Sequence, residues 1–418
     1  EGVATGFLVA GPDMPDINNQ DERRHFVLND ITATVGSAFL GLTMGCAQCH
    51  DHPYDPVSQA DFYRLRAFFD PMPEFRRDRQ LDPEMRDAED ARPVSHAYVR
   101  GDFRRPGPVV SAGFPRIADS LRTAAASLRA DLAQWLTGAD NALFCRVAVN
   151  RVWQQHFGRG LVTSSGDFGH QGEKPTHPEL LDWLATELPR QGWSLKKLHR
   201  LIVLSATYRQ ASFVEGAGKR DASHGSESTY ARFPRRRLTG EALRDGMLFT
   251  AGLLNPKAGG VSVRLPLPPE VSANLLKKQQ EMTADVAEHD RRSIYTFSRR
   301  NLRYPLFDLF DRPDALMSCS RRSESTTAPQ ALLLFNSEFS QRAAQGLAQR
   351  VLEGTDTAPG TLVAEAMRLC FGRAPTGREA ALGVAFLQRQ TALAPTLRDA
   401  LTDYCLALLN SNAFVWVD

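Results

Sequence analysis

The chain has 418 residues, of which 42% are hydrophobic and 23% charged, and its formal net charge is only +2. This length is enough for two or three domains, and the near-neutral charge gives no overall field that would attract nucleic acid or a membrane surface. Six cysteines are too few for a disulfide scaffold in a chain of this length. No apolar run is long enough to span a bilayer, so we expect no transmembrane segment.

The first predicted elements are two helices that flank a short connection. Residues 26–42 carry apolar side chains at helical spacing, which predicts a helix that runs into Gly45. Ser58 or Gln59 then begins a second, short helix, whose apolar side is rich in phenylalanine. The sequence therefore predicts a helix–loop–helix arrangement around the segment between them.

That segment contains Cys46-Ala47-Gln48-Cys49-His50. Cys-x-x-Cys-His is the attachment signature of c-type haem. Cys46 and Cys49 can bond to the two vinyl groups of one porphyrin, and His50 is then placed to give a ring nitrogen to the iron. We therefore predict haem c as the cofactor, held by Cys46, Cys49 and His50.

Two other interpretations of the same segment stay open. Because His52 and Asp55 follow closely, the cluster can instead hold a bare zinc or iron ion through cysteine, His50, His52 and Asp55. The cysteines can also be purely structural, as free thiols or a disulfide in a tight turn. In the haem interpretation Met44 and Met72 are the nearest candidates in sequence for a sixth iron ligand, although methionine more often fills a core.

The rest of the chain is predicted to be mainly helical. Residues 71–115 are rich in Pro, Arg and Asp and predict an irregular linker or wrapping segment. Helical spacing returns near residue 116. Helix caps are expected at Asp140 or Asn141, at Ser194 and, as a capping box, at residues 176–179, and a helix near 240–254 is expected to follow Thr239. One or two short strands are predicted within 255–275, and two final helices near 360–372 and 396–410. The predicted fold class is mainly α, a multi-helix chain with irregular Pro/Arg-rich linkers and a few short strands.

Other candidate site residues are less specific. His156 and His177 lie beside distinctive runs, and each favours a hydrogen-bonded structural role. A cluster of arginines suits haem propionates or an anionic sugar if it converges, and intrachain ion pairs if it does not; it comprises Arg291, Arg292, Arg299, Arg300 and Arg303. Four carboxylates are possible acids or bases without a spacing that pairs them: Asp167, Glu173, Asp182 and Glu241.

Several runs resemble the planctomycete-type cytochrome-associated family, which pairs a planctomycete cytochrome C-like domain and a PSD domain, both of uncharacterised function. The first run extends from Phe39 through the cysteine motif to Asp55-Pro56. The others are Asn150-Arg151-Val152-Trp153, Asp167-Phe168-Gly169, Pro175 to Leu184, Ser205 to Gln210, Ala328 to Asn336 and Leu408 to Phe414.

The resemblance implies a division of the chain and a location. Residues 1–75 would be the C-terminal part of the cytochrome-like domain, 76–115 a linker or wrapping segment, and 116–418 a helical PSD-type domain. A full protein of this kind would continue upstream of Glu1. The resemblance also implies a bacterial protein outside the cytoplasm, in the periplasm or cell envelope.

Together these observations favour a c-type haem protein with a redox or electron-transfer role. Its partner would be a redox protein or an anionic or carbohydrate substrate, with polysaccharide breakdown as one setting. The alternatives are a non-haem zinc or iron protein that acts on carbohydrate, and a non-catalytic binding or scaffold module. No catalytic residue is assigned from the sequence, and whether the chain is an enzyme stays open.

Overall fold

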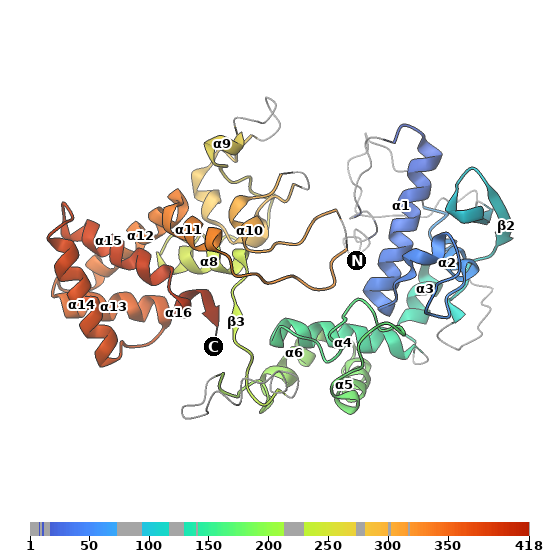
Figure 1. The fold of residues 1–418 in the computed structure, drawn as a ribbon, viewed down its shortest axis with the longest axis horizontal. Helices are drawn as coiled ribbons and strands as arrows, with labels where there is room; N and C mark the ends of the chain where they lie inside the picture. The colour runs from blue at the N-terminus through green and yellow to red at the C-terminus, as the bar shows by residue number, and fades with distance from the viewer. Residues whose placement is uncertain are drawn as a thin grey trace. The chain divides into compact units, whose positions relative to one another are not determined.

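The structure is a computed structural model that describes residues 8, 11, 17–72, 94–116, 129–138, 141–212, 230–272, 281–299, 302–316 and 318–417. As predicted, the chain is mainly α-helical, and its described part contains two small two-stranded sheets (Figure 1). It forms two compact units. Unit 1 comprises residues 1–234 and 315–321, and unit 2 comprises residues 235–314 and 322–418. None of the described helices combines the length and the apolar character needed to cross a membrane.

Unit 1 begins with the predicted helix–loop–helix. Helix α1 (Gln20–Val35) is capped by the Asn19 side chain and continues as a π-helical turn, η2 (Gly36–Leu40). The 3-10 helix η3 (Met44–Gln48) follows, and α2 (Gln59–Arg66) begins at Ser58 with a capping box. Apolar side chains of these elements form the first hydrophobic core of unit 1.

A β-hairpin lies where the sequence predicts an irregular linker. Strand β1 (Ser95–Tyr98) pairs antiparallel with β2 (Pro106–Val110), and η4 (Val99–Gly101) lies in the turn. The prediction of an irregular segment is wrong for these residues. Because no residue of either strand is fully buried, the hairpin lacks the apolar alternation that reveals a strand in sequence. Residues 117–128 of the helix predicted from residue 116 lie outside the described residues, and the described part of that region contains α3 (Arg129–Leu136).

Three further helices complete unit 1. Helix α4 (Ala142–Phe157) is capped by Asn141 and ends at Gly158, and α6 (Leu195–Val203) is capped by Ser194, both as predicted. Helix α5 (Pro178–Arg190) begins where expected, but the capping box does not form, because His177 is the N-cap residue and its side chain makes no cap bond. These three helices surround a second hydrophobic core in unit 1.

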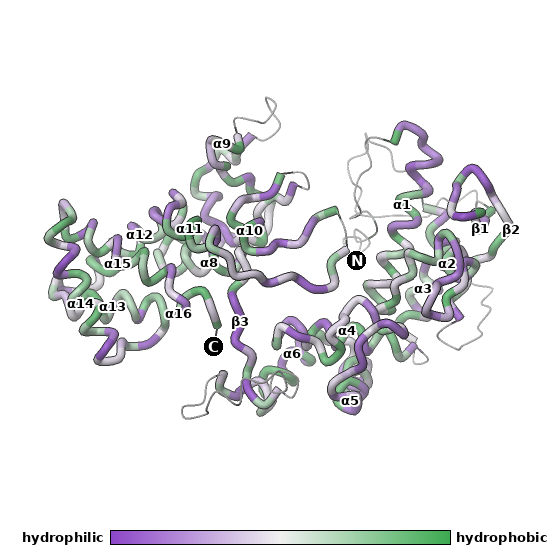
Figure 2. The backbone as a smooth tube through the Cα atoms, viewed as in Figure 1, coloured by the Kyte–Doolittle hydropathy of each residue, from purple (hydrophilic) through white to green (hydrophobic). Residues whose placement is uncertain are grey.

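Unit 2 has its own hydrophobic core, built mainly from helices. Helix α8 (Gly240–Thr250) follows Thr239, and α13 (Pro359–Phe371) and α15 (Leu397–Leu409) match the two final predicted helices. Hydrophobic and hydrophilic residues alternate along the longer helices of this unit (Figure 2), and α8 and α13 bury residues three or four positions apart, which lie on one face of a helix. The remaining elements are α9 (Pro269–Ser272), η7 (Val286–Asp290), η8 (Ser293–Tyr295), α10 (Pro305–Leu309), α11 (Ala328–Asn336), α12 (Glu338–Gly354), α14 (Gly377–Thr391), α16 (Asn412–Val415), and the paired strands β3 (Arg236–Arg237) and β4 (Trp416–Val417).

The strands predicted within 255–275 do not form in the described residues. Asn255 and Val263 make only isolated bridges, to Arg291 and Thr296. Apart from α9, the described part of this segment is irregular backbone, consistent with its many prolines and glycines.

Candidate functional site

The Cys-x-x-Cys-His segment lies on η3 and the turn that follows it. The side chains alternate between core and solvent: Met44 and Ala47 are fully buried, whereas Cys46, Cys49 and His50 are exposed. Both cysteines are free. The short helix is therefore anchored by apolar side chains and presents both thiols and the imidazole to solvent.

The middle of the motif is fixed by hydrogen bonds from three neighbouring elements. The Gln48 carbonyl oxygen accepts from the Tyr63 hydroxyl at 2.8 Å and from Gln59 Nε2 at 3.1 Å. Gln59 Nε2 also donates to the Tyr98 carbonyl oxygen of β1 at 3.0 Å, and Asn29 Nδ2 of α1 donates to Gln48 Oε1 at 3.1 Å. Because burial raises the pKa of Tyr63, its hydroxyl keeps the proton that it donates.

A buried polar cluster lies beside the hydrogen bonds that hold Gln48. Arg66 Nη1 donates to His25 Nδ1 and to Asn29 Oδ1, each at 3.1 Å. His25 Nε2 lies 3.1 Å from the Gly101 carbonyl oxygen, which can only accept, so the ring carries its proton on Nε2. Burial and then the Arg66 charge lower the pKa of His25 to about 4. His25 is therefore neutral, and both of its ring nitrogens are used inside the protein.

His50 has the opposite tautomer. Its Nδ1 lies 2.6 Å from the carbonyl oxygen of Asp51, so Nδ1 carries the proton and donates it. The lone pair is then on Nε2, the ring nitrogen that a metal ligand commonly uses when Nδ1–H is held by a carbonyl group. Two free, exposed thiols and an imidazole in this tautomer fit the requirements for attaching a c-type haem.

The hairpin turn contacts the second thiol. Gly101 has φ 74°, and a Cβ atom at this position would lie 2.8 Å from Cys49 Sγ. Glycine is therefore needed at residue 101 both for its left-handed backbone and for the close approach of the turn to Cys49.

His52 and Asp55, the additional ligands of the bare-metal interpretation, are engaged elsewhere. His52 Nδ1 accepts from the Asp55 backbone N–H at 2.9 Å, and the His52 side chain is only 5% exposed. Asp55 Oδ1 accepts from both the backbone N–H of His170, at 2.6 Å, and His170 Nδ1, at 3.1 Å. Within the described residues no three His, Cys, Asp or Glu side chains are grouped to hold a metal ion, so the five proposed ligands are not brought together.

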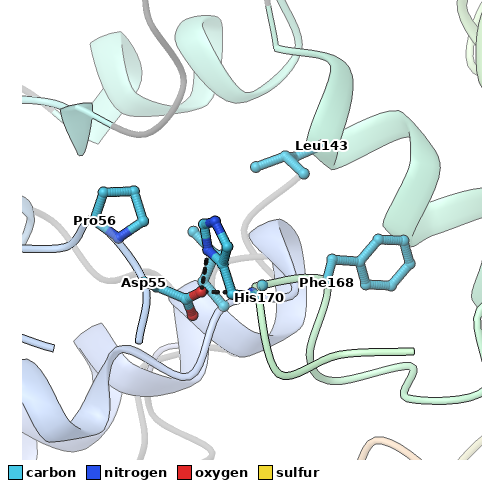
Figure 3. Close-up of a pocket in the computed structure, with 7 residues that line it drawn as sticks. Asp55, Pro56, Leu143, Phe168 and His170 are labelled. Carbon is cyan, nitrogen blue, oxygen red and sulfur yellow. Dashed lines mark hydrogen bonds and ion pairs between the residues drawn. The ribbon is translucent and has the colours of Figure 1, made fainter. Parts of the chain in front are cut away.

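The Asp55–His170 pair lies in a pocket of about 240 Å³ (Figure 3). The pocket is open toward the imidazole, because the His170 side chain is 70% exposed whereas that of Asp55 is 4% exposed. A Cβ atom at Gly169 would lie 2.2 Å from Asp55 Oδ2, so only glycine leaves room for the carboxylate. The other lining residues are Leu42, Pro56, Leu143 and Phe168.

Sequence reasoning missed His170 as a functional residue. The histidine is 115 residues from Asp55 in the chain, and no spacing rule links the two. The only sequence signal was its position directly after the Asp167-Phe168-Gly169 run.

The other candidate histidines and carboxylates have local partners. His156 Nε2 lies 2.8 Å from His199 Nδ1, and His177 Nδ1 lies 3.0 Å from Thr176 Oγ1. The four carboxylates are held by cations or backbone groups: Asp167 by the Gly169 N–H, Glu173 near Arg159, Asp182 by Arg146, and Glu241 by Arg322. Met44 and Met72 are both core residues.

Three arginines of the cluster in unit 2, Arg291, Arg292 and Arg303, form intrachain ion pairs. Arg291 is buried, donates to Glu288 at 2.9 Å and lies 4.1 Å from the Tyr295 ring centroid. Arg303 donates to Asp308 at 2.6 Å. Arg292 lies 3.9 Å from Asp245, and Arg300 lies outside the described residues. The described geometry therefore matches the ion-pair alternative for Arg291 and Arg303.

Comparison with protein families gives two matches that divide the chain. The PSD1 model, a protein of unknown function (DUF1553), matches residues 128–387, more than half of the chain. The PSCyt2 model, also a protein of unknown function (DUF1549), matches residues 1–74, which include the cysteine motif and Asp55. Neither the curated proteins nor the solved structures contain a match.

Proposed function

We propose that this chain, which belongs to the PSD1 family and carries a PSCyt2 segment, binds haem c covalently and transfers electrons. The observation that carries the proposal is the Cys-x-x-Cys-His turn, with both thiols exposed and free and with the lone pair of His50 on Nε2. When bound, the haem supplies an iron centre that gains or loses one electron.

The residues of the chain have distinct tasks in this proposal. Cys46 and Cys49 would hold the porphyrin through thioether bonds to its two vinyl groups, an addition that needs no oxidant or reductant. His50 Nε2 would be the iron ligand. The Asp51 carbonyl oxygen accepts the His50 Nδ1 proton, which fixes the ring orientation and makes Nε2 more basic.

The location and partners follow from this chemistry. Haem is attached to such motifs outside the bacterial cytoplasm, so the proposed location is the periplasm or cell envelope. The proposed partner is a redox protein that exchanges single electrons, and oxidation of an anionic or carbohydrate substrate in polysaccharide breakdown is one setting for it.

The test is expression of the chain in a host that matures c-type cytochromes. We expect one haem per chain that survives denaturation, measured by the pyridine haemochrome spectrum and by mass spectrometry. The double variant C46S/C49S should lose covalent haem, and His50→Ala should keep it with an altered Soret band. Cys319→Ser is the matched control, because Cys319 is also free and exposed but lies outside the motif.

Two results would contradict the proposal. One is a wild-type chain without covalent haem from a host that loads a control cytochrome. The other is stoichiometric zinc or iron without porphyrin in the same sample, which would support the bare-metal alternative despite the separated positions of its ligands.

A further inference from the structure

We propose that Asp55 and His170 form an acid–base site that binds a small, neutral, ring-bearing hydroxy compound and takes up its hydroxyl proton. This site is distinct from the cysteine motif, and the proposal does not depend on haem. It rests on the geometry of the pair, on its position in a pocket and on the chemistry of the pocket wall.

The pair has the arrangement of a general base and the carboxylate that orients it. The Asp55 carboxylate can only accept when ionised, so the 3.1 Å contact places the His170 proton on Nδ1. His170 Nε2, on the side of the ring away from Asp55, then holds the lone pair (Figure 3). A second bond, from the His170 backbone N–H to the same oxygen at 2.6 Å, fixes the ring to the carboxylate. This is the combination that activates histidine in acid–base catalysis.

Stability alone does not account for the arrangement. Burying a carboxylate costs free energy unless it is well paired, and within the described part of the chain the one side chain that donates a hydrogen bond to Asp55 is an imidazole that is 70% exposed. An ion pair with so exposed a partner contributes little. His52 Nδ1 is 3.8 Å from Asp55 Oδ2 but already accepts the Asp55 backbone N–H.

The pocket wall selects the kind of ligand. Four of the seven lining residues, Leu42, Pro56, Leu143 and Phe168, are apolar, and none of the seven is Lys or Arg. A phosphate or carboxylate ligand would therefore find no lysine or arginine there. A sugar would leave most of its hydroxyl groups against apolar side chains, which is costly.

The volume limits the size of the ligand. At about 240 Å³ the pocket is smaller than the roughly 300–1,000 Å³ typical of sites for drug-sized molecules. A single ring with one hydroxyl group fits this space. Its O–H group can donate the one hydrogen bond that the lone pair of His170 Nε2 can accept. In the proposed step the proton moves from the ligand oxygen to Nε2, Asp55 stabilises the resulting imidazolium, and the ligand remains as an oxyanion; no electron is transferred.

The probe for this proposal is 4-nitrophenol, which absorbs visible light strongly only when ionised. The full chain, prepared without haem so that the visible range is clear, is titrated into the probe at a pH where most of the free probe is protonated. We expect a saturable rise in phenolate absorbance with the wild-type chain. His170→Gln should abolish the rise, and glucose in excess should not compete.

Two further variants complete the test. Asp55→Asn should weaken the response by about tenfold, the equivalent of about 1.4 kcal/mol, because the amide stabilises the imidazolium less than the carboxylate. His199→Gln is the control, since His199 is exposed, pairs with His156 rather than with Asp55 and lies outside the pocket. His170 is exposed, so His170→Gln is expected to fold, and far-ultraviolet circular dichroism checks this. An equal response in His170→Gln, saturable binding without ionisation, or no binding by the wild-type chain would each overturn the proposal.

Discussion

Four histidines of unit 1 differ in tautomer, and their hydrogen-bond partners determine which can act on a ligand. His25 and His52 accept at Nδ1, from Arg66 and from a backbone N–H, and both rings are buried. His50 and His170 donate at Nδ1, to a carbonyl oxygen and to a carboxylate, and both rings are exposed. Of these four, only His50 and His170 are left with a basic Nε2 that solvent and ligands can reach.

Gly169→Ala should separate Asp55 from His170. The new Cβ would lie 2.2 Å from Asp55 Oδ2 and 2.6 Å from its Cγ, so the carboxylate must move from its buried position. We expect the 4-nitrophenol response to fall at least as far as in Asp55→Asn, about tenfold, as a charge-assisted hydrogen bond is lost. Gly360→Ala is the control, because a Cβ there meets no atom within 4 Å. An unchanged response in Gly169→Ala would show that the close contact does not position the pair.

His25 should make stability depend on pH in a defined window. Its pKa is about 4 in the folded chain and 6.5 in the unfolded chain, so between these values the unfolded chain binds more protons. Stability is therefore lost as the pH falls from 6.5 toward 4, by about 3 kcal/mol at most, and this contribution changes no further below pH 4. Denaturant titrations of the wild type and His25→Gln at a series of pH values measure it. His25→Gln is expected to be less stable than the wild type at every pH, and its free energy of unfolding should change less with pH in this window. Parallel curves for the two proteins would refute the assignment of this pH dependence to His25.

At the scale of elements, the sequence predicted the helix caps and helix starts, which depend only on residues that are close together in the chain. The caps at Asn141 and Ser194 and the helices after Ser58 and Thr239 are confirmed, because each N-cap side chain accepts from an N–H group only three residues away. The β1–β2 hairpin was missed, since its strands are half-exposed and lack apolar alternation. The partnership of Asp55 with His170 was missed for a different reason: it depends on tertiary structure that brings together distant loops.

The capping box of α2 should contribute more to the free energy of unfolding than the ion pair between Asp61 and Arg116. Asp61 is buried, and its carboxylate accepts from the Ser58 N–H at 3.0 Å and from the Ser58 hydroxyl at 2.6 Å. Asp61→Ala should lower the free energy of unfolding by about 1–2 kcal/mol through loss of the cap. Because α2 supplies Gln59 and Tyr63 to the Gln48 carbonyl, the same variant should also loosen the cysteine motif.

Arg116→Ala provides the matched comparison for that variant. Arg116 Nε lies 3.2 Å from Asp61 Oδ1, but the Arg116 side chain is 58% exposed, so its loss should cost less than about 1 kcal/mol. Urea unfolding measures both variants, and the rate of thiol labelling at Cys46 and Cys49 reports the motif. Equal losses in the two variants would mean that the ion pair, rather than the cap, stabilises the start of α2.

At the scale of the whole molecule, the sequence indicated the fold class and the cysteine motif but not the compact units. The mainly α class follows from helical spacing that any one helix shows by itself. Unit boundaries depend instead on which helices share a core, and residues 315–321 belong to unit 1 although unit 2 surrounds them in sequence. No local pattern in those seven residues could have assigned them.

Because the hydrophobic core of unit 2 is separate from the two cores of unit 1, a cavity in the core of unit 2 should destabilise that unit selectively. Leu347 of α12 is fully buried there, and Leu347→Ala should cost about 2–5 kcal/mol, whereas Leu382→Ala, at a side chain that is 61% exposed, should cost little. Four of the five tryptophans, at positions 135, 153, 183 and 193, lie in unit 1. We therefore expect Leu347→Ala to lower the midpoint of thermal unfolding followed by far-ultraviolet circular dichroism more than the midpoint followed by tryptophan fluorescence. Equal shifts in the two midpoints would show instead that the two units unfold as one cooperative structure, since a cavity in one core would then reduce the stability reported from both.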